Sequence, residues 1–332
     1  MSKIYELDIF NINMDIIEKA ANALKKDNTV IFPTETVYGL GANGLSDVAI
    51  KKIYKAKGRP SDNPLILHLS KLEDILKYCY LPYSMYEKIE SLVPGPITFV
   101  LNKKDIVPYA ITAGRETVAV RIPAHPIANK LIEASNIPIA APSANISGKP
   151  SPTYPEHVIE DMKDKVDYIL VSGKLEFGIE STIINLTEDI PTLLRPGPIP
   201  PEKLKNIFGD IEIPDFIYGK NDADVAIAPG MKYRHYAPDS NVIIMENINK
   251  INNIENPIFL ILKSNEKYFK NNNLPYEIIS EDKDHYQFGI NLFYMLRKYD
   301  KKYKNIVVQS IEDKGIGIAI MNRLRKAANK TI

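Results

Sequence analysis

The chain has 332 residues, of which 45% are apolar and 25% are charged, and its formal net charge is +1. This composition excludes general disorder, and the near-neutral balance provides no bulk attraction to nucleic acid or an anionic membrane. A single cysteine, Cys79, excludes intramolecular disulfides and multi-thiolate zinc sites. Early charges and short apolar runs, such as 258–262, predict a cytoplasmic protein without a signal peptide or membrane span.

The first two-thirds of the chain alternates helical and strand-like patterns, which is typical of an α/β domain. The spacing predicts a helix over 13–26, a strand over 29–32, and a helix that starts at an N-cap, Ser46, and ends at Gly58. Leucines alternate with other residues over 65–69, which predicts a half-buried strand. Further strands are expected at 97–101, 117–122, 137–141, 168–172, 181–186 and 192–195.

The pattern changes after a helix expected at 201–208. Residues 209–240 carry Gly, Pro and Asp with little periodicity, which indicates a linker. The segment 241–332 is rich in Asn, Lys and Ile, with strands expected at 242–245, 258–262 and 306–309 and a helix at 320–328. The sequence therefore predicts a large α/β domain over 1–208, an interdomain linker over 209–240, and a small α/β domain over 241–332.

Gly39, Gly41 and Gly44 form a literal G-x-G-x-x-G pattern. A dinucleotide fold needs this turn directly after a strand, with an acidic residue at the end of the next strand. Here residues 33–39 separate the expected strand from the glycines, and Asp62 precedes the next strand. These positions disfavour a dinucleotide site. Walker-type and H-E-x-x-H motifs are absent, so any nucleotide must be bound without a P-loop.

Basic residues cluster between Lys51 and Arg59. Lys57 and Arg59 flank Gly58, where they could bind a polyphosphate or only satisfy the negative end of the helix. Spacing leaves both interpretations open.

Arg121 shares one face of the expected strand 117–122 with Thr117 and Ala119. A guanidinium beside such small residues requires an anionic partner. That partner is either an internal Asp or Glu or the carboxylate of a ligand.

Polar loops follow several expected strands. The loop after 137–141 contains three serines and Asn145, and strand ends at 178–182 and 194–197 each carry a hydroxyl or a cation. Such loops are where α/β folds place ligands, although plain turns have a similar composition. The linker contains PGMKYRHYAP at 229–238, whose tyrosines could stack on a base or join the two domains.

The chain resembles the YrdC-type threonylcarbamoyl-AMP synthases in the ordered segments FPTETVYGLGANG, KAKGRPSDNPLILHL, TVAVRIP, APSANISGKPS, GIESTIINL and LLRPGP. The linker motif and the second domain resemble the long form of that family. The resemblance implies a twisted mixed-sheet YrdC-like catalytic domain and a small Rossmann-like α/β domain. It also implies the conversion of L-threonine, bicarbonate or CO2 and ATP into threonylcarbamoyl-AMP and pyrophosphate, the first step of tRNA threonylcarbamoyl-adenosine modification at position 37.

The resemblance implies site residues motif by motif. For catalysis these are Lys57, Arg59, Ser143 and Asn145. For ATP they are Lys57, Arg59, Asn63, Thr117, Ser143, Asn145, Ser151, Arg195 and Tyr236, with Tyr233 as an alternative lid residue. For threonine they are Thr36, His68, Arg121, Ala141 and Ser181. Magnesium is expected to arrive on the ATP phosphates rather than to be held by the protein alone. The product is expected to pass to a separate tRNA threonylcarbamoyl transferase complex, without membrane or stable nucleic-acid binding.

Two other functions compete with this one. The first is carbamoyl-adenylate formation from carbamoyl-phosphate, as in the YrdC-like part of hydrogenase maturation proteins, whose acylphosphatase-like and zinc-finger segments this sequence lacks. The second is an RNA-binding module that uses the basic residues 51–59, which would show tight, salt-dependent RNA binding without ATP turnover.

Overall fold

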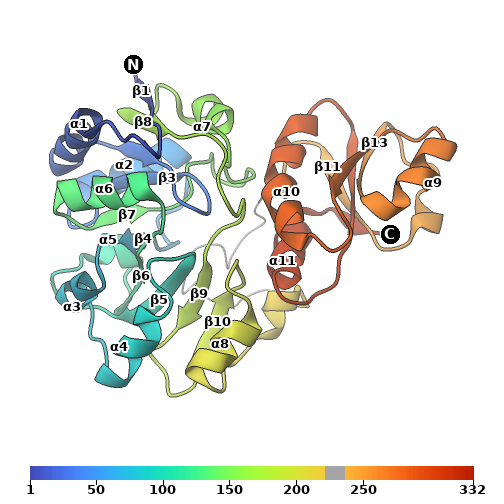
Figure 1. The fold of residues 1–332 in the computed structure, drawn as a ribbon. Coiled ribbons are helices and arrows are strands. Elements are labelled where there is room, and N and C mark those ends of the chain that lie inside the picture. The colour runs from blue at the N-terminus through green and yellow to red at the C-terminus, as the bar shows by residue number, and fades with distance from the viewer. Residues whose placement is uncertain (221–235) are drawn as a thin grey trace.

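The computed structural model describes residues 1–220 and 236–332, and these form two α/β domains (Figure 1). The strands of the first domain are β1 Lys3–Glu6, β2 Val30–Phe32, β3 Gly39–Asn43, β4 Ile66–His68, β5 Ile97–Asn102, β6 Thr117–Arg121, β7 Ile139–Ala141, β8 Tyr168–Val171, β9 Thr182–Asn185 and β10 Thr192–Arg195. Its helices are α1 Met14–Lys25, α2 Asp47–Lys57, η1 Leu72–Asp74, α3 Ile75–Tyr78, α4 Tyr83–Glu90, α5 Tyr109–Thr112, α6 Pro126–Ser135, α7 Pro155–Met162, α8 Pro201–Phe208 and η2 Asp215–Tyr218.

The second domain is smaller. Its strands are β11 Asn241–Met245, β12 Pro257–Leu262, β13 Tyr276–Ser280, β14 Asn305–Gln309 and β15 Lys330–Thr331. Its helices are η3 Ile248–Lys250, η4 Lys263–Asn265, α9 Glu266–Asn271, α10 His285–Tyr299 and α11 Gly317–Ala327.

The two sheets differ in strand direction. The first is a ten-stranded mixed sheet in the order β1-β8-β2-β3-β7-β4-β6-β5-β9-β10. The second is a five-stranded parallel sheet in the order β13-β12-β14-β11-β15. The expected mixed α/β first domain and Rossmann-like second domain are confirmed. Among the described residues, no helix is long and apolar enough to cross a bilayer.

Local signals in the sequence place several elements correctly. Ser46 caps α2 by accepting a hydrogen bond from the Ala49 amide at 3.3 Å, and Gly58 ends this helix with a left-handed φ of 60°. Other elements were missed, although α6 and α10 carry N-cap side chains. These are β1, β3, β13 and β15 and the helices α3, α4, α5, α6, α7, α9 and α10.

The expectation of a half-buried β4 is wrong. This strand lies between β7 and β6 in the middle of the sheet, and all three of its residues are buried. Leu65 and Leu67 belong to the main apolar core on one face, whereas Ile66 packs with Ala119 on the other. Phe216 of η2 packs against that second group.

The glycines of the G-x-G-x-x-G pattern lie in and directly after β3, not in a turn that opens a helix. They allow close packing within the sheet. A Cβ on Gly41 would lie 2.7 Å from the Phe32 ring, and a Cβ on Gly44 would lie 2.5 Å from a Leu67 methyl group. The pattern therefore reflects packing, which agrees with disfavouring a dinucleotide site.

Part of the expected linker packs against the first domain. Residues 209–220 contribute Ile211 and Ile217 to its core, and Glu212 forms a bridge beside Thr192. Residues 221–235, which include Tyr233 and most of the PGMKYRHYAP motif, lie outside the described residues. Tyr236 lies within them and is buried.

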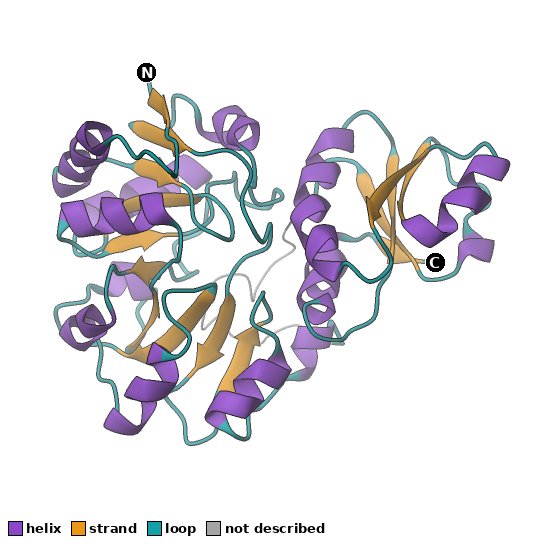
Figure 2. Cartoon of the chain, in the orientation of Figure 1, coloured by secondary structure: helices purple, strands orange, loops and turns teal. Residues whose placement is uncertain are grey.

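In the second domain, α10 and α11 lie on the side of the sheet that faces the first domain, and α9 lies on the far side (Figures 1 and 2). Phe288 and Leu292 of α10 pack with Val242 and Ile306 in one apolar cluster. Phe269 of α9 belongs to a separate cluster on the opposite face. The face of α10 and α11 directed away from their own sheet is therefore available to the first domain.

We predict that Gly44→Ala lowers the free energy of unfolding by about 1–3 kcal/mol, because the added methyl group must displace Leu67 or the Pro138 carbonyl, 2.9 Å away. Urea denaturation measures this change, with exposed Lys51→Ala on α2 as the control. Wild-type stability in Gly44→Ala would contradict the packing role.

Candidate active site

A cavity that opens to solvent lies over the middle of the first sheet. Its floor is formed by residues from neighbouring strands and its wall by residues from the loops around them. The lining includes Thr34, Val37, Gly39, Ile66, His68, Arg121, Ala141, Pro142, Ser143, Asn145, Lys149, Glu180, Arg195 and Tyr236.

Strand register explains the composition of the floor. His68 of β4 pairs with Arg121 of β6, Ile66 pairs with Ala141 of β7, and Gly39 of β3 bridges Ser143. Directly paired residues share one face of a sheet. The floor therefore combines two polar side chains with small residues that leave space above the strands.

Arg121 is the buried cation of this floor. Its Nη2 donates to Glu35 Oε1 at 2.8 Å and to Thr36 Oγ1 at 2.9 Å, and only 4% of its side chain is exposed. An internal glutamate is therefore present, as one of the two sequence interpretations required. Within the described part of the chain, however, Arg121 Nε and Glu35 Oε2 have no hydrogen-bond partner. Arg121 lines the cavity, and its Nε is a buried donor without a partner among the described residues.

His68 lies beside Arg121 and is buried as well. Burial, and secondarily the Arg121 charge, lower the pKa of His68 to about 3. Its Nδ1 lies 3.2 Å from the Ile66 carbonyl, and its ring meets Phe32 edge-on at 5.9 Å. His68 is therefore a neutral hydrogen-bonding group at neutral pH.

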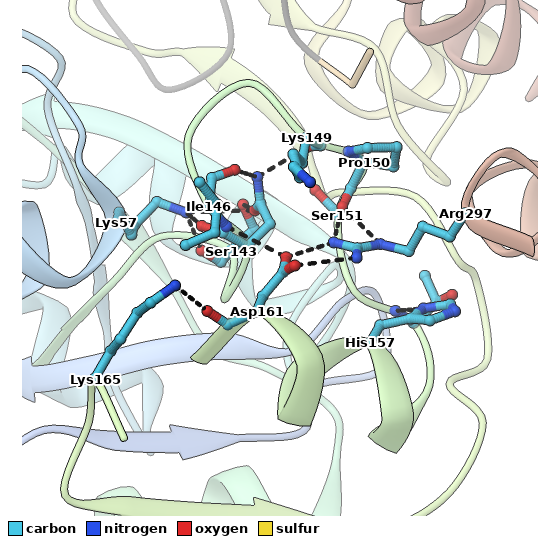
Figure 3. A network of polar contacts seen from close by, with 12 residues as sticks. Lys57, Ser143, Ile146, Lys149, Pro150, Ser151, His157, Asp161, Lys165 and Arg297 are labelled. Atoms are coloured by element: carbon cyan, nitrogen blue, oxygen red, sulfur yellow. Dashed lines mark hydrogen bonds and ion pairs between the residues drawn. The ribbon is translucent and has the colours of Figure 1, made fainter. Parts of the chain in front are cut away.

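The loop formed by residues 143–151 makes one wall of the cavity, and Lys57 holds its first part (Figure 3). Lys57 Nζ donates to the carbonyls of Ser143 at 2.5 Å and Asn145 at 2.6 Å, and it lies 3.3 Å from Asn145 Oδ1. Burial lowers the pKa of Lys57 well below its usual value. An ammonium group has three protons, so these acceptors occupy all of them.

The opposite wall carries Arg195 and Glu180, and Ser181 is hydrogen-bonded to Arg195. Arg195 Nε donates to the Ser181 carbonyl at 3.0 Å, and its Nη2 lies 3.1 Å from Ser181 Oγ. Glu180 Oε1 accepts a very short hydrogen bond from Ser151 Oγ. Burial opposes ionisation of Glu180, but Arg323, Arg195 and this hydrogen bond outweigh it and hold its pKa below the usual value.

Tyr236 closes the cavity from the side of the second domain. Its ring stacks on Phe293 of α10 at 5.1 Å, and burial raises its pKa to about 12. The next residue, Ala237, donates its amide to the Gly148 carbonyl at 3.0 Å. The end of the expected linker is therefore attached to the loop 143–151.

Not every expected site residue lines the cavity. Arg59, Asn63 and Thr117 lie where β4 and β6 begin, and Arg59 Nη2 donates to the Asn63 carbonyl at 3.2 Å. Burial lowers the pKa of Arg59 to about 10, so it remains a cation. Thr36, Ser181 and Ser151 do not line the cavity themselves. Thr36 accepts a hydrogen bond from Arg121, Ser181 accepts one from Arg195, and Ser151 donates one to Glu180, and these three partners line the cavity.

The structure adds residues that the sequence interpretation missed. Glu35, Lys149 and Glu180 occur inside the quoted motifs, yet only the fold shows which cations they face or which wall they form. Their presence within hydroxyl-rich motifs was the one available signal. No cluster of three or more metal-ligating side chains occurs among the described residues.

Family models match both domains. The model described as "Telomere recombination" for Sua5, YciO and YrdC matches residues 22–197. The model described as "Threonylcarbamoyl-AMP synthase, C-terminal domain" matches residues 199–329.

Relatives match along the whole chain. The chain is 46% identical over 329 residues to the threonylcarbamoyl-AMP synthase of Pyrococcus abyssi, covering 95% of both proteins. It is 40% identical to that of Bacillus subtilis, covering 97% of this chain and 95% of the relative. The crystal structure of P. abyssi Sua5 complexed with L-threonine matches with a TM-score of 0.91 and 42% identity over 100% of both chains. Escherichia coli YciO matches 59% of this chain with a TM-score of 0.55 and 26% identity.

We predict that the protein loses stability as the pH falls from about 6.5 towards 4. Burial lowers the pKa of both His68 and His157 to about 3, whereas histidine in an unfolded chain titrates near 6.5. Between these values the unfolded state binds more protons, so each histidine reduces the free energy of unfolding by up to about 1.4 kcal/mol per pH unit. Urea denaturation at several pH values measures the slope, and His68→Gln should make it shallower. An unchanged slope in that variant would contradict the assignment.

Proposed function

The chain belongs to the Sua5/YciO/YrdC family in its two-domain threonylcarbamoyl-AMP synthase form, and we propose that the cavity above its first sheet carries out this synthesis. The enzyme combines L-threonine, bicarbonate or CO2 and ATP into threonylcarbamoyl-AMP and pyrophosphate. The observation that carries the assignment to this cavity is Arg121, a buried guanidinium with an available donor, placed between neutral His68 and Thr36. The threonine complex of the similar P. abyssi protein supports threonine as its ligand.

The threonine subsite is assigned to the floor of the cavity. Arg121 binds the carboxylate of threonine, because its Nε and the fork of its guanidinium suit a planar anion. His68 and Thr36 contribute neutral hydrogen bonds beside it, and Ala141 leaves space for the ligand. Ser181 approaches from the opposite wall.

The nucleotide subsite is assigned to the walls. Ser143 and Asn145 lie on one side of the cavity and Arg195 on the other, with Tyr236 at its edge. Arg59, Asn63 and Thr117 extend the subsite towards the beginning of β4 and β6, where the Asn63 Oδ1 is buried without a hydrogen-bond partner among the described residues. Ser151 belongs to the nucleotide subsite through its hydrogen bond to Glu180. Lys57 must give up one loop oxygen before its ammonium contacts a phosphate.

The reaction requires positioned charge more than a strong base. The threonine amine adds to CO2 and loses a proton, which forms a carbamate. A carbamate oxygen then bonds to the α-phosphorus of ATP, and the bond to the bridging oxygen breaks to release pyrophosphate. The cations and hydroxyls of the walls hold the two anions in line and neutralise the developing charge.

Magnesium is proposed to enter with ATP. The absence of a ligand cluster from the described residues is compatible with a metal that the triphosphate itself holds. The ion would neutralise charge on the departing pyrophosphate. The threonylcarbamoyl-AMP is proposed to pass, in the cytoplasm, to a separate transferase that modifies tRNA.

We predict that pyrophosphate release from ATP requires threonine, bicarbonate and magnesium together. The assay omits each component in turn, adds EDTA in a parallel sample, and identifies the adenylate by mass. Release supported by carbamoyl-phosphate instead would favour carbamoyl-adenylate formation. No turnover by folded protein, combined with salt-dependent RNA binding, would favour the RNA-binding alternative.

We predict that Arg121→Lys raises the KM for threonine at least tenfold, because lysine keeps the charge beside Glu35 but loses the planar fork. Arg121→Ala should raise it further, although it also leaves Glu35 buried without its cation. Steady-state pyrophosphate release measures both. Arg115→Lys, in the loop before β6, is the matched control and should keep the wild-type KM. An unchanged threonine KM in folded Arg121→Lys would remove Arg121 from the site.

A further inference from the structure

The second domain places two buried arginines against the first domain. Arg323 projects from α11 and has an exposed side-chain fraction of 0%, and Arg297 projects from α10 with 8% exposed. The guanidinium groups of both arginines contact loops that carry residues of the nucleotide subsite proposed above. Neither arginine belongs to the sequence motifs that identify the site.

Arg323 connects three parts of the cavity wall. Its Nε donates to Glu180 Oε2 at 3.0 Å, and its Nη1 donates to the Pro196 carbonyl at 2.5 Å, directly after Arg195. Its guanidinium carbon lies 5.9 Å from the centre of the Tyr236 ring. One guanidinium therefore sets the relative positions of Glu180, the end of β10 and Tyr236.

Arg297 is hydrogen-bonded to the end of the loop 143–151 (Figure 3). Its Nη2 donates to the Pro150 carbonyl at 2.5 Å and to Asp161 Oδ2 at 2.6 Å. The same Asp161 oxygen accepts the Ile146 amide at 3.3 Å. Arg297 thus acts on the loop from the side opposite to Lys57, both directly and through Asp161.

The domains also approach each other closely at the Glu180 loop. Gly178 has a left-handed φ of 69°, and a Cβ at this position would lie 2.5 Å from the Ile290 Cα of α10. The loop is therefore in backbone contact with the second domain two residues before Glu180.

We propose that Arg323 and Arg297 are positioning residues through which the second domain sets the nucleotide subsite, while the carboxylate-binding part of the threonine subsite at Arg121 is not set by them. The proposal rests on the function assigned above. Arg323 contacts Glu180, which binds Ser151, and it also contacts the carbonyl that follows Arg195 and the ring of Tyr236. Arg297 contacts the loop 143–151. The threonine groups Arg121, Thr36 and His68 instead lie on the first domain's own strands and their adjoining segments, and no contact of Arg323 or Arg297 reaches these three among the described interactions. Ser181 differs from them, because it follows Glu180 and accepts a hydrogen bond from Arg195.

The choice of arginine supports positioning over simple adhesion between domains. Burying a cation is costly unless several acceptors surround it, and apolar residues join two domains at lower cost. A guanidinium can engage a carboxylate and a carbonyl at fixed angles, which a lysine cannot do. Both arginines use this geometry on one carboxylate and one loop carbonyl each.

The test compares Arg323→Lys and Arg297→Lys with the wild type. Each variant should raise the KM for ATP at least tenfold, whereas threonine affinity, measured by calorimetry without ATP, should stay within twofold. Arg325→Lys on α11 is the matched control, because Arg325 pairs with Asp313 inside the second domain. This control should keep both wild-type constants.

A double variant separates positioning from the cost of an unpaired buried charge. Arg297→Met combined with Asp161→Asn removes both charges of the pair, and the ATP defect should persist because the loop loses its anchor. Recovery of the wild-type KM for ATP in this variant, or parallel losses of threonine and ATP binding in the single variants, would overturn the proposal. Absence of pyrophosphate release by the wild type would instead refute the proposed function.

Discussion

The ion pair between Arg121 and Glu35, 2.8 Å apart inside the first sheet, dictates much of what surrounds it. Both groups are nearly inaccessible to water, so their desolvation must be balanced by close polar partners. The pair itself and Thr36 supply part of this balance, but a donor on Arg121 and an acceptor on Glu35 stay unused within the described structure. A polar ligand at the floor of the cavity would therefore supply the hydrogen bonds that these two groups lack, and the small residues beside them leave space for it.

The same constraint explains how the cavity is enclosed. Loops that carry carbonyls, hydroxyls and Glu180 cannot be covered by an apolar surface without stranding those groups. The structure covers them with cations at both sides, namely Lys57 from α2 and the two arginines from α10 and α11. Tyr236 belongs to both environments, because it lines the cavity and also packs in the core of the second domain. Residues of both domains therefore contribute to the surroundings of the cavity.

The sequence allowed prediction of several features that depend on neighbours along the chain. The alternation around Arg121 identified the strand face that carries it, and Ser46 and Gly58 identified the ends of α2. Features that depend on pairing across the fold were inaccessible. Glu35 lies 86 residues from Arg121, and the burial of β4 depends on residues from distant segments that pack on its two faces. Lys57 shows the same limit, because neither sequence interpretation anticipated its bonds to loop oxygens 86 and 88 residues away.

The contact between Glu180 and Arg323 also has a consequence for protein synthesis, because 143 residues separate the two side chains. At about 5–20 residues per second, translation of that stretch takes roughly 7–30 s. Once β10 has been made, the nascent first domain can form its sheet within this interval, yet Glu180 lacks the cation that pairs with it in the finished protein. The wall of the cavity is completed only when α11 emerges and docks. Translation that halts between the domains would thus yield the sheet of the enzyme with Glu180, beside its active site, lacking its direct ion-pair partner.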